Sequence, residues 1–316
     1  MDESDELKIL GLISTILDED DDERRRYLAD KILEIDPGNA VAKYVKWQSA
    51  DNPAALQDTT LLEEAVNLLR PDIVPPSDSS DPPAKDIAMY SVYLCMLSDL
   101  ASFNYVKGNR DLAFEAASEF MRLDRNGDAT ARAVYYASLL ERGEFEEVVR
   151  AAGDDIFETV PGEHCRAIAA FELDGCGEKA LRSLVNAIAL DPDVPYYILG
   201  IWSLDYEIEN LEDDNGYVKE VMITIPVLLE QWSANEERLA FLSAVVFPFG
   251  YITGRVEGPD DIRMIEDGCR ELGCLDAIQE SRDIIHAMLA SGHDQEEVDR
   301  KALSMFMEND CFGLLE

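Results

Sequence analysis

The apolar positions of residues 161–194 recur every three or four residues in two blocks, which predicts two short helices. A glycine-containing break at 175–177 separates the blocks, and Pro192 ends the second, because proline cannot continue a helix. Small side chains at Ala180 and Ala187 would let the two helices approach closely. The segment therefore predicts an antiparallel helical hairpin. The apolar positions of its two blocks are Ala167, Ile168, Phe171, Ala180, Leu184 and Ala187.

Three other stretches show parts of the same pattern. Residues 27–38 read as a helix that ends in Ile-Asp-Pro, much as the hairpin above ends in Leu-Asp-Pro. Residues 94–127 place a turn at Gly108-Asn109 between two apolar blocks, and residues 129–153 place one at Gly143. Four such units together are a stronger signal than any one of them, because single amphipathic helix pairs are common.

This combination of small residues, large residues and closing turns resembles the tetratricopeptide (TPR) repeat, whose period is about 34 residues. The resemblance implies an all-α fold, an α-solenoid of TPR-like helical hairpins with a C-terminal helical cap. It also implies a scaffold that holds another protein and performs no chemistry of its own.

Residues 122–149 and 180–200 are further similar to one group of TPR proteins, the bacterial relatives of the suppression-of-tumorigenicity-7 protein. In that group, a proline-plus-tyrosine segment closes the array before a helix that ends in tryptophan. The similarity covers residues 84–240 and departs from the group at 130–133. Because the group has no established catalytic residues, the resemblance implies only an architecture. The matching positions are Tyr196, Tyr197, Leu199, Gly200 and Trp232.

The pattern divides the chain into four parts. Residues 1–70 predict an N-terminal helical, TPR-like segment, and residues 71–83 (PDIVPPSDSSDPP) predict a proline-rich linker. Residues 84–194 would form the TPR array and residues 195–316 a C-terminal helical region. In the first part a helical stripe is formed by Leu7, Leu10, Ile13 and Leu17.

The C-terminal region contains one stretch where we expect strand. Residues 247–259 hold several glycines and prolines and predict a small hairpin. An apolar helix is expected at 217–231, kinked at Pro226. Three more helices are expected at 260–272, 275–291 and 294–309, ending near Gly273, Gly292 and Gly313.

The charge of the chain narrows the range of partners. Lysine and arginine number 27 against 66 aspartates and glutamates, which gives a net charge of −39. Such a chain repels nucleic-acid backbones and anionic membranes, so we expect neither as a direct partner. Two interpretations stay open: a solvated acidic surface, as in a protein adapted to high salt, or an acidic groove that selects a basic protein or peptide. An acidic mimic of nucleic acid is a third.

The cysteine pattern and the apolar runs favour a cytoplasmic protein. None of the six cysteines lies in a C-x-x-C pair, and the acidic N-terminus predicts no signal peptide. The longest apolar run, residues 241–252, is too short to span a bilayer.

Candidate chemistry is sparse. Cys269, Cys274, His286 and His293 have the spacing C-x4-C-x11-H-x6-H, which misses the zinc-finger spacing at two intervals. Asp124, Asn126 and Asp128 resemble the opening of a calcium loop, but lack its glycine and its final glutamate. No phosphate-binding loop or nucleophile elbow occurs, and no cofactor is implied.

The function that the sequence favours is therefore a non-catalytic scaffold or adaptor, which binds a peptide or helix in a concave acidic groove. The first helix of each repeat would line this groove, so the candidate partner-binding residues are Tyr105, Arg132 and Tyr136. The alternative is an enzyme or metal-binding protein with its site in the C-terminal helical region.

Overall fold

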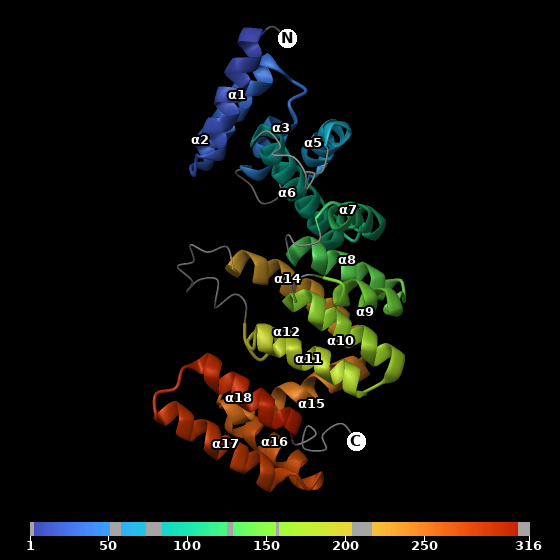
Figure 1. The fold of residues 1–316 in the computed structure, drawn as a ribbon, viewed down its shortest axis with the longest axis vertical. Coiled ribbons are helices and arrows are strands. Elements are labelled where there is room, and N and C mark those ends of the chain that lie inside the picture. The colour runs from blue at the N-terminus through green and yellow to red at the C-terminus, as the bar shows by residue number, and fades with distance from the viewer. Residues whose placement is uncertain are drawn as a thin grey trace. The chain divides into compact units, whose positions relative to one another are not determined.

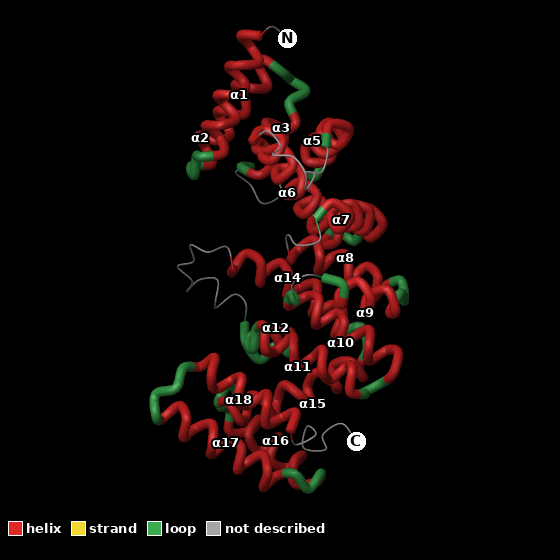
Figure 2. The backbone as a smooth tube through the Cα atoms, viewed as in Figure 1, coloured by secondary structure: helices red, strands yellow, loops and turns green. Residues whose placement is uncertain are grey.

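The computed structural model of the chain describes residues 3–50, 58–73, 84–124, 129–155, 158–203 and 217–308. Every long regular element among these residues is an α-helix, and none of them forms a strand (Figures 1 and 2). The predicted all-α class is therefore confirmed. No helix in this part of the chain has both the length and the apolar character needed to cross a membrane.

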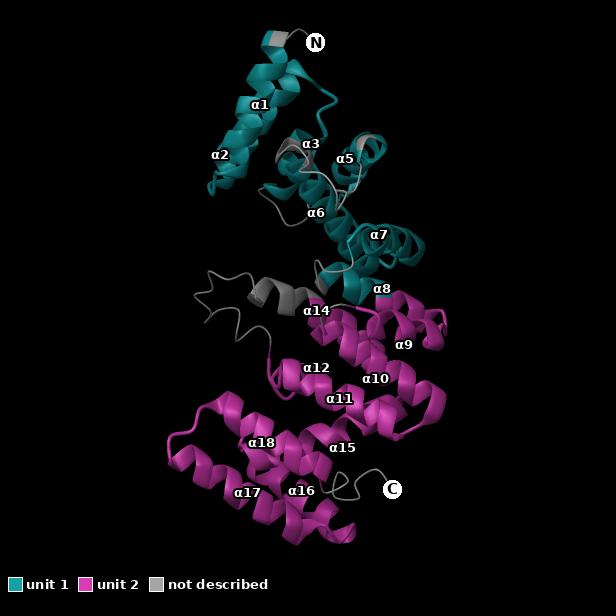
Figure 3. Ribbon diagram, in the orientation of Figure 1, with its two compact units in different colours: residues 1–135 teal, residues 136–316 magenta. Residues whose placement is uncertain are grey.

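The chain packs as two compact units, residues 1–135 and residues 136–316 (Figure 3). The boundary lies within α8 (Ala129–Glu141), inside the segment predicted as one repeat array. The short 3-10 helix η1 (Arg70–Asp72) opens the predicted proline-rich linker. Residues 74–83 of that linker lie outside the described residues.

Helices of the first unit pack against their neighbours in sequence. Two of them begin at polar side chains that accept backbone N–H groups, as helix starts require. Asp21 accepts from the N–H of Arg24 at 2.7 Å, and Asn39 from that of Ala42 at 3.1 Å. The helices of this unit before α8 are α1 (Glu3–Leu17), α2 (Asp22–Ile35), α3 (Ala40–Gln48), α5 (Thr60–Leu69), α6 (Ala84–Val106) and α7 (Arg110–Leu123).

One apolar cluster joins the N-terminal helices of this unit. It consists of Ile9 and Ile16 from α1, together with buried side chains of α2 and α3. Met89 and Val92 of α6 pack against the same cluster, so α6 and α1 share one core although about 70 residues of chain separate them. The members from α2 and α3 are Ala29, Ile32, Val41, Ala42 and Val45.

The hairpin predicted from residues 161–194 is confirmed in the second unit. Helix α10 (Val160–Asp174) and helix α11 (Glu178–Leu190) pack against each other. Gly175 between them has a φ of +71°, a conformation that glycine adopts at little cost. Asp191 closes the hairpin by accepting the N–H groups of Asp193 and Val194 at 2.9 and 3.2 Å.

Replacing Ala180 with leucine should destabilise this hairpin. Ala180 is 1% exposed and lies where α11 packs on α10, so a larger side chain must displace its neighbours. We expect a loss of about 1–3 kcal/mol in the free energy of unfolding, measured by urea denaturation. Lys179→Leu is the control, because Lys179 beside it is 81% exposed. Equal stability of Ala180→Leu and the wild type would show that the two helices do not pack at this position.

The rest of the second unit continues as helices after α8, α9 (Phe145–Gly153), α10 and α11. The three C-terminal helices confirm the predicted ones to within two residues, and Gly273 and Gly292 follow two of them with φ of +76° and +89°. Gly313 lies outside the described residues. The remaining helices among the described residues are α12 (Val194–Ile198), α14 (Tyr217–Trp232), α15 (Glu236–Thr253), α16 (Pro259–Glu271), α17 (Leu275–Ala290) and α18 (Gln295–Glu308).

The hairpin predicted at 247–259 is wrong. Helix α15 runs through Pro248 and ends only at Thr253, before Gly254 in the left-handed conformation. Gly250 lets the backbone of α15 approach Tyr196 of α12 closely, because a Cβ at position 250 would lie 2.7 Å from the hydroxyl of Tyr196. The helical apolar period outweighs the glycine and proline signals here, because burial of that face stabilises the helix. The buried residues that follow this period include Phe241, Leu242, Val245, Val246, Phe249 and Ile252.

Candidate functional site

The three residues predicted to contact a partner are buried. Tyr105, Arg132 and Tyr136 are 2%, 1% and 0% exposed. The guanidinium of Arg110 lies 3.7 Å from the centre of the Tyr105 ring, and the hydroxyl of Tyr136 donates to Asp155. All three are core residues. Because these side chains are packed in the interior, the candidate groove described below is built on other residues.

The four candidate zinc ligands are not brought together either. Cys269 and Cys274 are buried next to each other, and the thiol of Cys274 lies 3.5 Å from the carbonyl oxygen of Cys269. His286 and His293 are exposed. Throughout the described residues, no group of three or more histidine, cysteine, aspartate or glutamate side chains is placed to hold a metal ion. Asn126 and Asp128 of the calcium-like sequence lie outside these residues.

The adjacent His164 and Cys165 are unsuited to acid–base or nucleophilic chemistry near neutral pH. Both are fully buried. Burial lowers the pKa of His164 to about 3 and raises the pKa of Cys165 to about 12. Nδ1 of His164 accepts a hydrogen bond from Nε1 of Trp232 at 3.2 Å. This pair is part of the core of the second unit.

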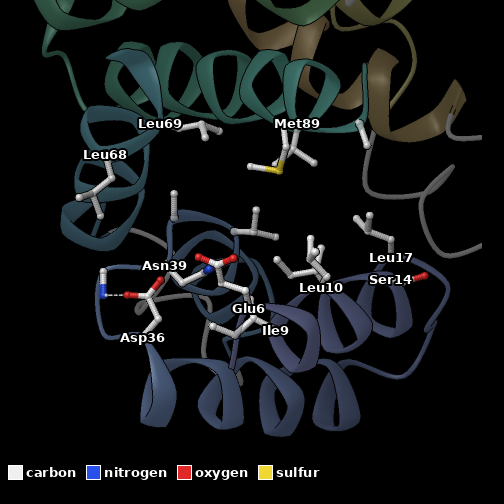
Figure 4. A pocket seen from close by; sticks show the side chains of 16 residues that line it. Glu6, Ile9, Leu10, Ser14, Leu17, Asp36, Asn39, Leu68, Leu69 and Met89 are labelled. Atoms are coloured by element: carbon white, nitrogen blue, oxygen red, sulfur yellow. Dashed lines mark hydrogen bonds between the residues drawn. The ribbon is translucent and has the colours of Figure 1, made fainter. Parts of the chain in front are cut away.

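The strongest candidate site is an apolar groove of about 630 Å³ in the first unit (Figure 4). It lies between α1 and α6, with the end of α5 and the α2–α3 turn closing one side. Met89 of α6 points across it toward Leu10 of α1. Most of the lining is aliphatic: Ile9, Leu10, Ile13, Leu17, Ala40, Val41, Leu68, Leu69, Ala88, Met89 and Val92.

Helix α1 forms one wall of the groove because it is apolar on two adjacent faces. One face, with Ile9 and Ile16, is buried in the core of the unit. Ile9 also reaches the groove. The other face, which lines the groove, consists of Leu10, Ile13 and Leu17, although Ile13 also packs against the core cluster. These three residues have the spacing i, i+3, i+7, the spacing by which one helix packs along another. Leu10 and Leu17 remain 41% and 53% exposed, so this face has no complete packing partner within the described residues.

The polar atoms of the groove are few, and most already serve the local backbone. Asp36 accepts the N–H of Gly38 at 3.1 Å, and Asn39 caps α3. Glu6 is exposed and has no hydrogen-bond or ion-pair partner among the described residues. Lysine and arginine are absent from the described residues that line the groove. The groove is therefore apolar along its length and acidic at the end that holds Glu6 and Asp36 (Figure 4).

Two smaller cavities of the second unit are weaker candidates. A cavity of about 420 Å³ over α10 and α11 contains Arg166, Lys179 and Arg182. Each of these cations is already paired with a carboxylate of the same hairpin, which reduces any attraction for an anion. A shallow cavity of about 350 Å³ between α15 and α16 is lined mainly by small and apolar side chains.

The sequence contained part of the signal for the groove. The predicted stripe of Leu7, Leu10, Ile13 and Leu17 falls on the side of α1 that is groove-lining or exposed, although Ile13 also packs against the core cluster of Ile9 and Ile16. When a short helix has apolar residues on two faces and only one of them packs in the core, the other is available to bind a partner. The opposite wall, made by α5 and α6, could not be found from the sequence, because it is distant along the chain.

No known family model matches this chain, and neither does any curated protein sequence. The geometry of the groove therefore carries the functional proposal.

Proposed function

We propose that this chain is a non-catalytic scaffold, built on TPR-like helical hairpins in an α-solenoid, that binds a helical segment of a partner protein in the groove of its first unit. The observation that carries the proposal is the row of Leu10, Ile13 and Leu17, which faces α6 across the groove and in which Leu10 and Leu17 are exposed and Ile13 is half-buried. Burying such a row against a partner is favourable in proportion to the apolar area removed from water.

A helix suits this groove better than an extended peptide. An extended chain needs partners for its backbone N–H and C=O groups, whereas a helix satisfies most of them internally. The described residues form no strand whose edge could pair with a peptide, and Asp36 and Asn39 are engaged by local backbone. Grooves of this kind usually recognise an amphipathic helix by contacts with apolar side chains at helical spacing.

The described cysteines are free thiols, which supports action in a reducing compartment such as the cytoplasm. No observation favours the alternative of an enzyme or a metal protein in the C-terminal region. The buried position of Cys269 and the exposed positions of His286 and His293 give that alternative no shared site.

Replacing Leu10 with aspartate should strongly weaken helix binding. A displayed library of helix-forming peptides of about 15–20 residues, randomised at every position, would first be selected on the wild-type protein. We expect enriched peptides to carry apolar residues at i, i+3 or i+4, and i+7. Binding of a synthesised winner to Leu10→Asp should be weaker by about 30-fold or more, as for a central interface residue, when measured by fluorescence anisotropy.

Leu112→Asp is the matched control. Leu112 lies on α7 of the same unit and is 49% exposed, close to the 41% of Leu10, but it does not line the groove. This control should bind as the wild type does, and both variants should retain the helical circular dichroism spectrum. The proposal would be contradicted by selected peptides that lack a helical apolar row. It would also be contradicted by selected peptides that bind Leu10→Asp and the wild type with equal affinity.

A further inference from the structure

We propose that the helix bound in this groove belongs to a basic partner and carries lysine or arginine at the end that meets Glu6 and Asp36, with its apolar row packed on Leu10, Ile13 and Leu17. This inference rests on the proposed function and names the chemistry of its partner. It also distinguishes a selective groove from an acidic surface that is merely well solvated.

The first observation is the sign of the groove's charge. Its lining contains two carboxylates, Glu6 and Asp36, and no cation among the described residues. Some exposed carboxylates elsewhere in the chain lie beside arginine or lysine, as Glu34 does beside Lys31 and Glu178 beside Arg182. Glu6 has no such neighbour among the described residues. An apolar helix with cationic flanks would supply the missing charge at the rim.

The second observation is that the charge is confined to one end. Glu6 and Leu17 both line the groove from α1 and lie about 16 Å apart along the helix, because their positions differ by eleven and the rise is about 1.5 Å per residue. Asp36 and Asn39 lie on the same side as Glu6, whereas Leu17 lies toward the other (Figure 4). A bound helix therefore meets carboxylates at one end and mainly aliphatic side chains, together with Ser14 near Leu17, along the rest of its length.

A second copy of this chain is a poor occupant for the groove. Residues 3–17 contain Glu3, Asp5 and Glu6, and Lys8 is their single cation. Pairing α1 with its counterpart would bring these acidic residues against an equally acidic groove, in a chain whose net charge is −39. Like charges across an interface oppose association, so the rim favours a partner of opposite charge.

The test compares two peptides on the full-length protein. Both are helical and carry leucine along the apolar row, at i, i+3 or i+4, and i+7. One has lysine and arginine at the positions on either side of this row, and the other has glutamate at those positions. Their dissociation constants would be measured at low and at moderate salt for the wild type, for Glu6→Gln/Asp36→Asn and for Glu6→Lys/Asp36→Lys. The net negative charge of the whole chain also attracts a basic peptide. The control is therefore Glu271→Gln/Asp276→Asn, which removes two carboxylates that lie outside the groove. Its two carboxylates are exposed residues of the second unit that form no ion pair with any described residue.

We expect the wild type and the control to bind the basic peptide at least about tenfold more tightly than the acidic one at low salt. Neutralising Glu6 and Asp36 should narrow this difference, and reversing their charge should invert it. Salt should weaken binding of the basic peptide mainly by slowing association.

Other outcomes would overturn the inference in distinguishable ways. If both peptides bind equally, and Leu10→Asp weakens both, the groove binds helices without selecting charge and only this inference fails. If the control pair lowers the preference as much as the groove pair does, selection comes from the overall charge and this inference also fails. If neither peptide binds, or if the chain forms a dimer that Leu10→Asp dissolves, the proposed function fails together with it.

Discussion

Acidification is expected to destabilise the second unit through His164, and replacing His164 with asparagine should remove that part of the loss. His164 is fully buried on α10, with Nδ1 accepting the hydrogen bond of Trp232. A proton on Nδ1 would break this bond and place a charge in the core. Burial accordingly lowers the pKa of His164 from its ordinary value of 6.5 to about 3.

The direction and the pH window follow from this lowered pKa. Above pH 6.5 the imidazole is neutral in both the folded and the unfolded chain, so its burial carries no proton-linked cost. Between pH 6.5 and pH 3 the unfolded chain binds a proton that the folded chain does not, and the free energy of unfolding falls as the pH falls. The slope is about 1.4 kcal/mol per pH unit, with a total loss of roughly 5 kcal/mol near pH 3.

The measurement is urea unfolding at several pH values between about 7 and 4, followed by tryptophan fluorescence. Other carboxylates titrate in the same range, and the neighbouring Glu163 acts in the opposite direction, because burial raises its pKa. Both proteins share these groups, so the difference between their slopes isolates His164. Asparagine can still accept the hydrogen bond of Trp232, although its smaller side chain lowers stability by a constant amount. Parallel slopes for the two proteins would show that His164 does not carry this acid sensitivity.

The helices that the sequence predicted well are those whose signals are local. In the α10–α11 hairpin the apolar period, the break at 175–177 and Pro192 all lie within the segment that they organise. The same signals misled at 247–259, where Pro248 and Gly250 lie inside α15. There the decisive contact, the close approach of Gly250 to Tyr196, comes from a residue distant along the chain. Local pattern therefore predicted the fold class and most helices, but not every helix end.

The candidate site was less predictable for a related reason. Helical spacing shows that Arg132 and Tyr136 share one face of α8, but it does not show whether that face points inward or outward. The structure buries both. The stripe on α1 had the reverse outcome, since Leu10 and Leu17 stay half-exposed while Ile9 and Ile16 fill the core. Which of two apolar faces is covered depends on neighbouring helices such as α6, and their position is not encoded in the local sequence.

Replacing Arg255 with alanine is the second substitution from which we expect a large effect, because it leaves a buried carboxylate without its cation. Arg255 follows α15 and its side chain is 10% exposed. Its Nη1 and Nη2 donate to the two carboxylate oxygens of Asp299 on α18 at 2.6 and 2.9 Å, and its Nε donates to Asp193 before α12 at 2.9 Å. Burial disfavours the charged guanidinium, yet the bonds to Asp299 and Asp193 hold its pKa above the ordinary value. One side chain thus joins three segments of the second unit.

We expect Arg255→Ala to lower the free energy of unfolding by about 3–5 kcal/mol, since the side chain of Asp299 is only 9% exposed and would keep a buried charge. Arg300→Ala is the control. Arg300 also pairs with a carboxylate, but it and Glu296 are 71% and 85% exposed, and such pairs contribute roughly 0–1 kcal/mol. Comparing Arg255→Met with Arg255→Met/Asp299→Leu separates charge from packing, because both keep an apolar side chain at position 255 and only the single variant leaves Asp299 without its cation. If the unpaired charge is the cause, the double variant should be more stable than Arg255→Met; if the two are equally unstable, the loss comes from the shape or the hydrogen bonds of Arg255 rather than from the charge left on Asp299.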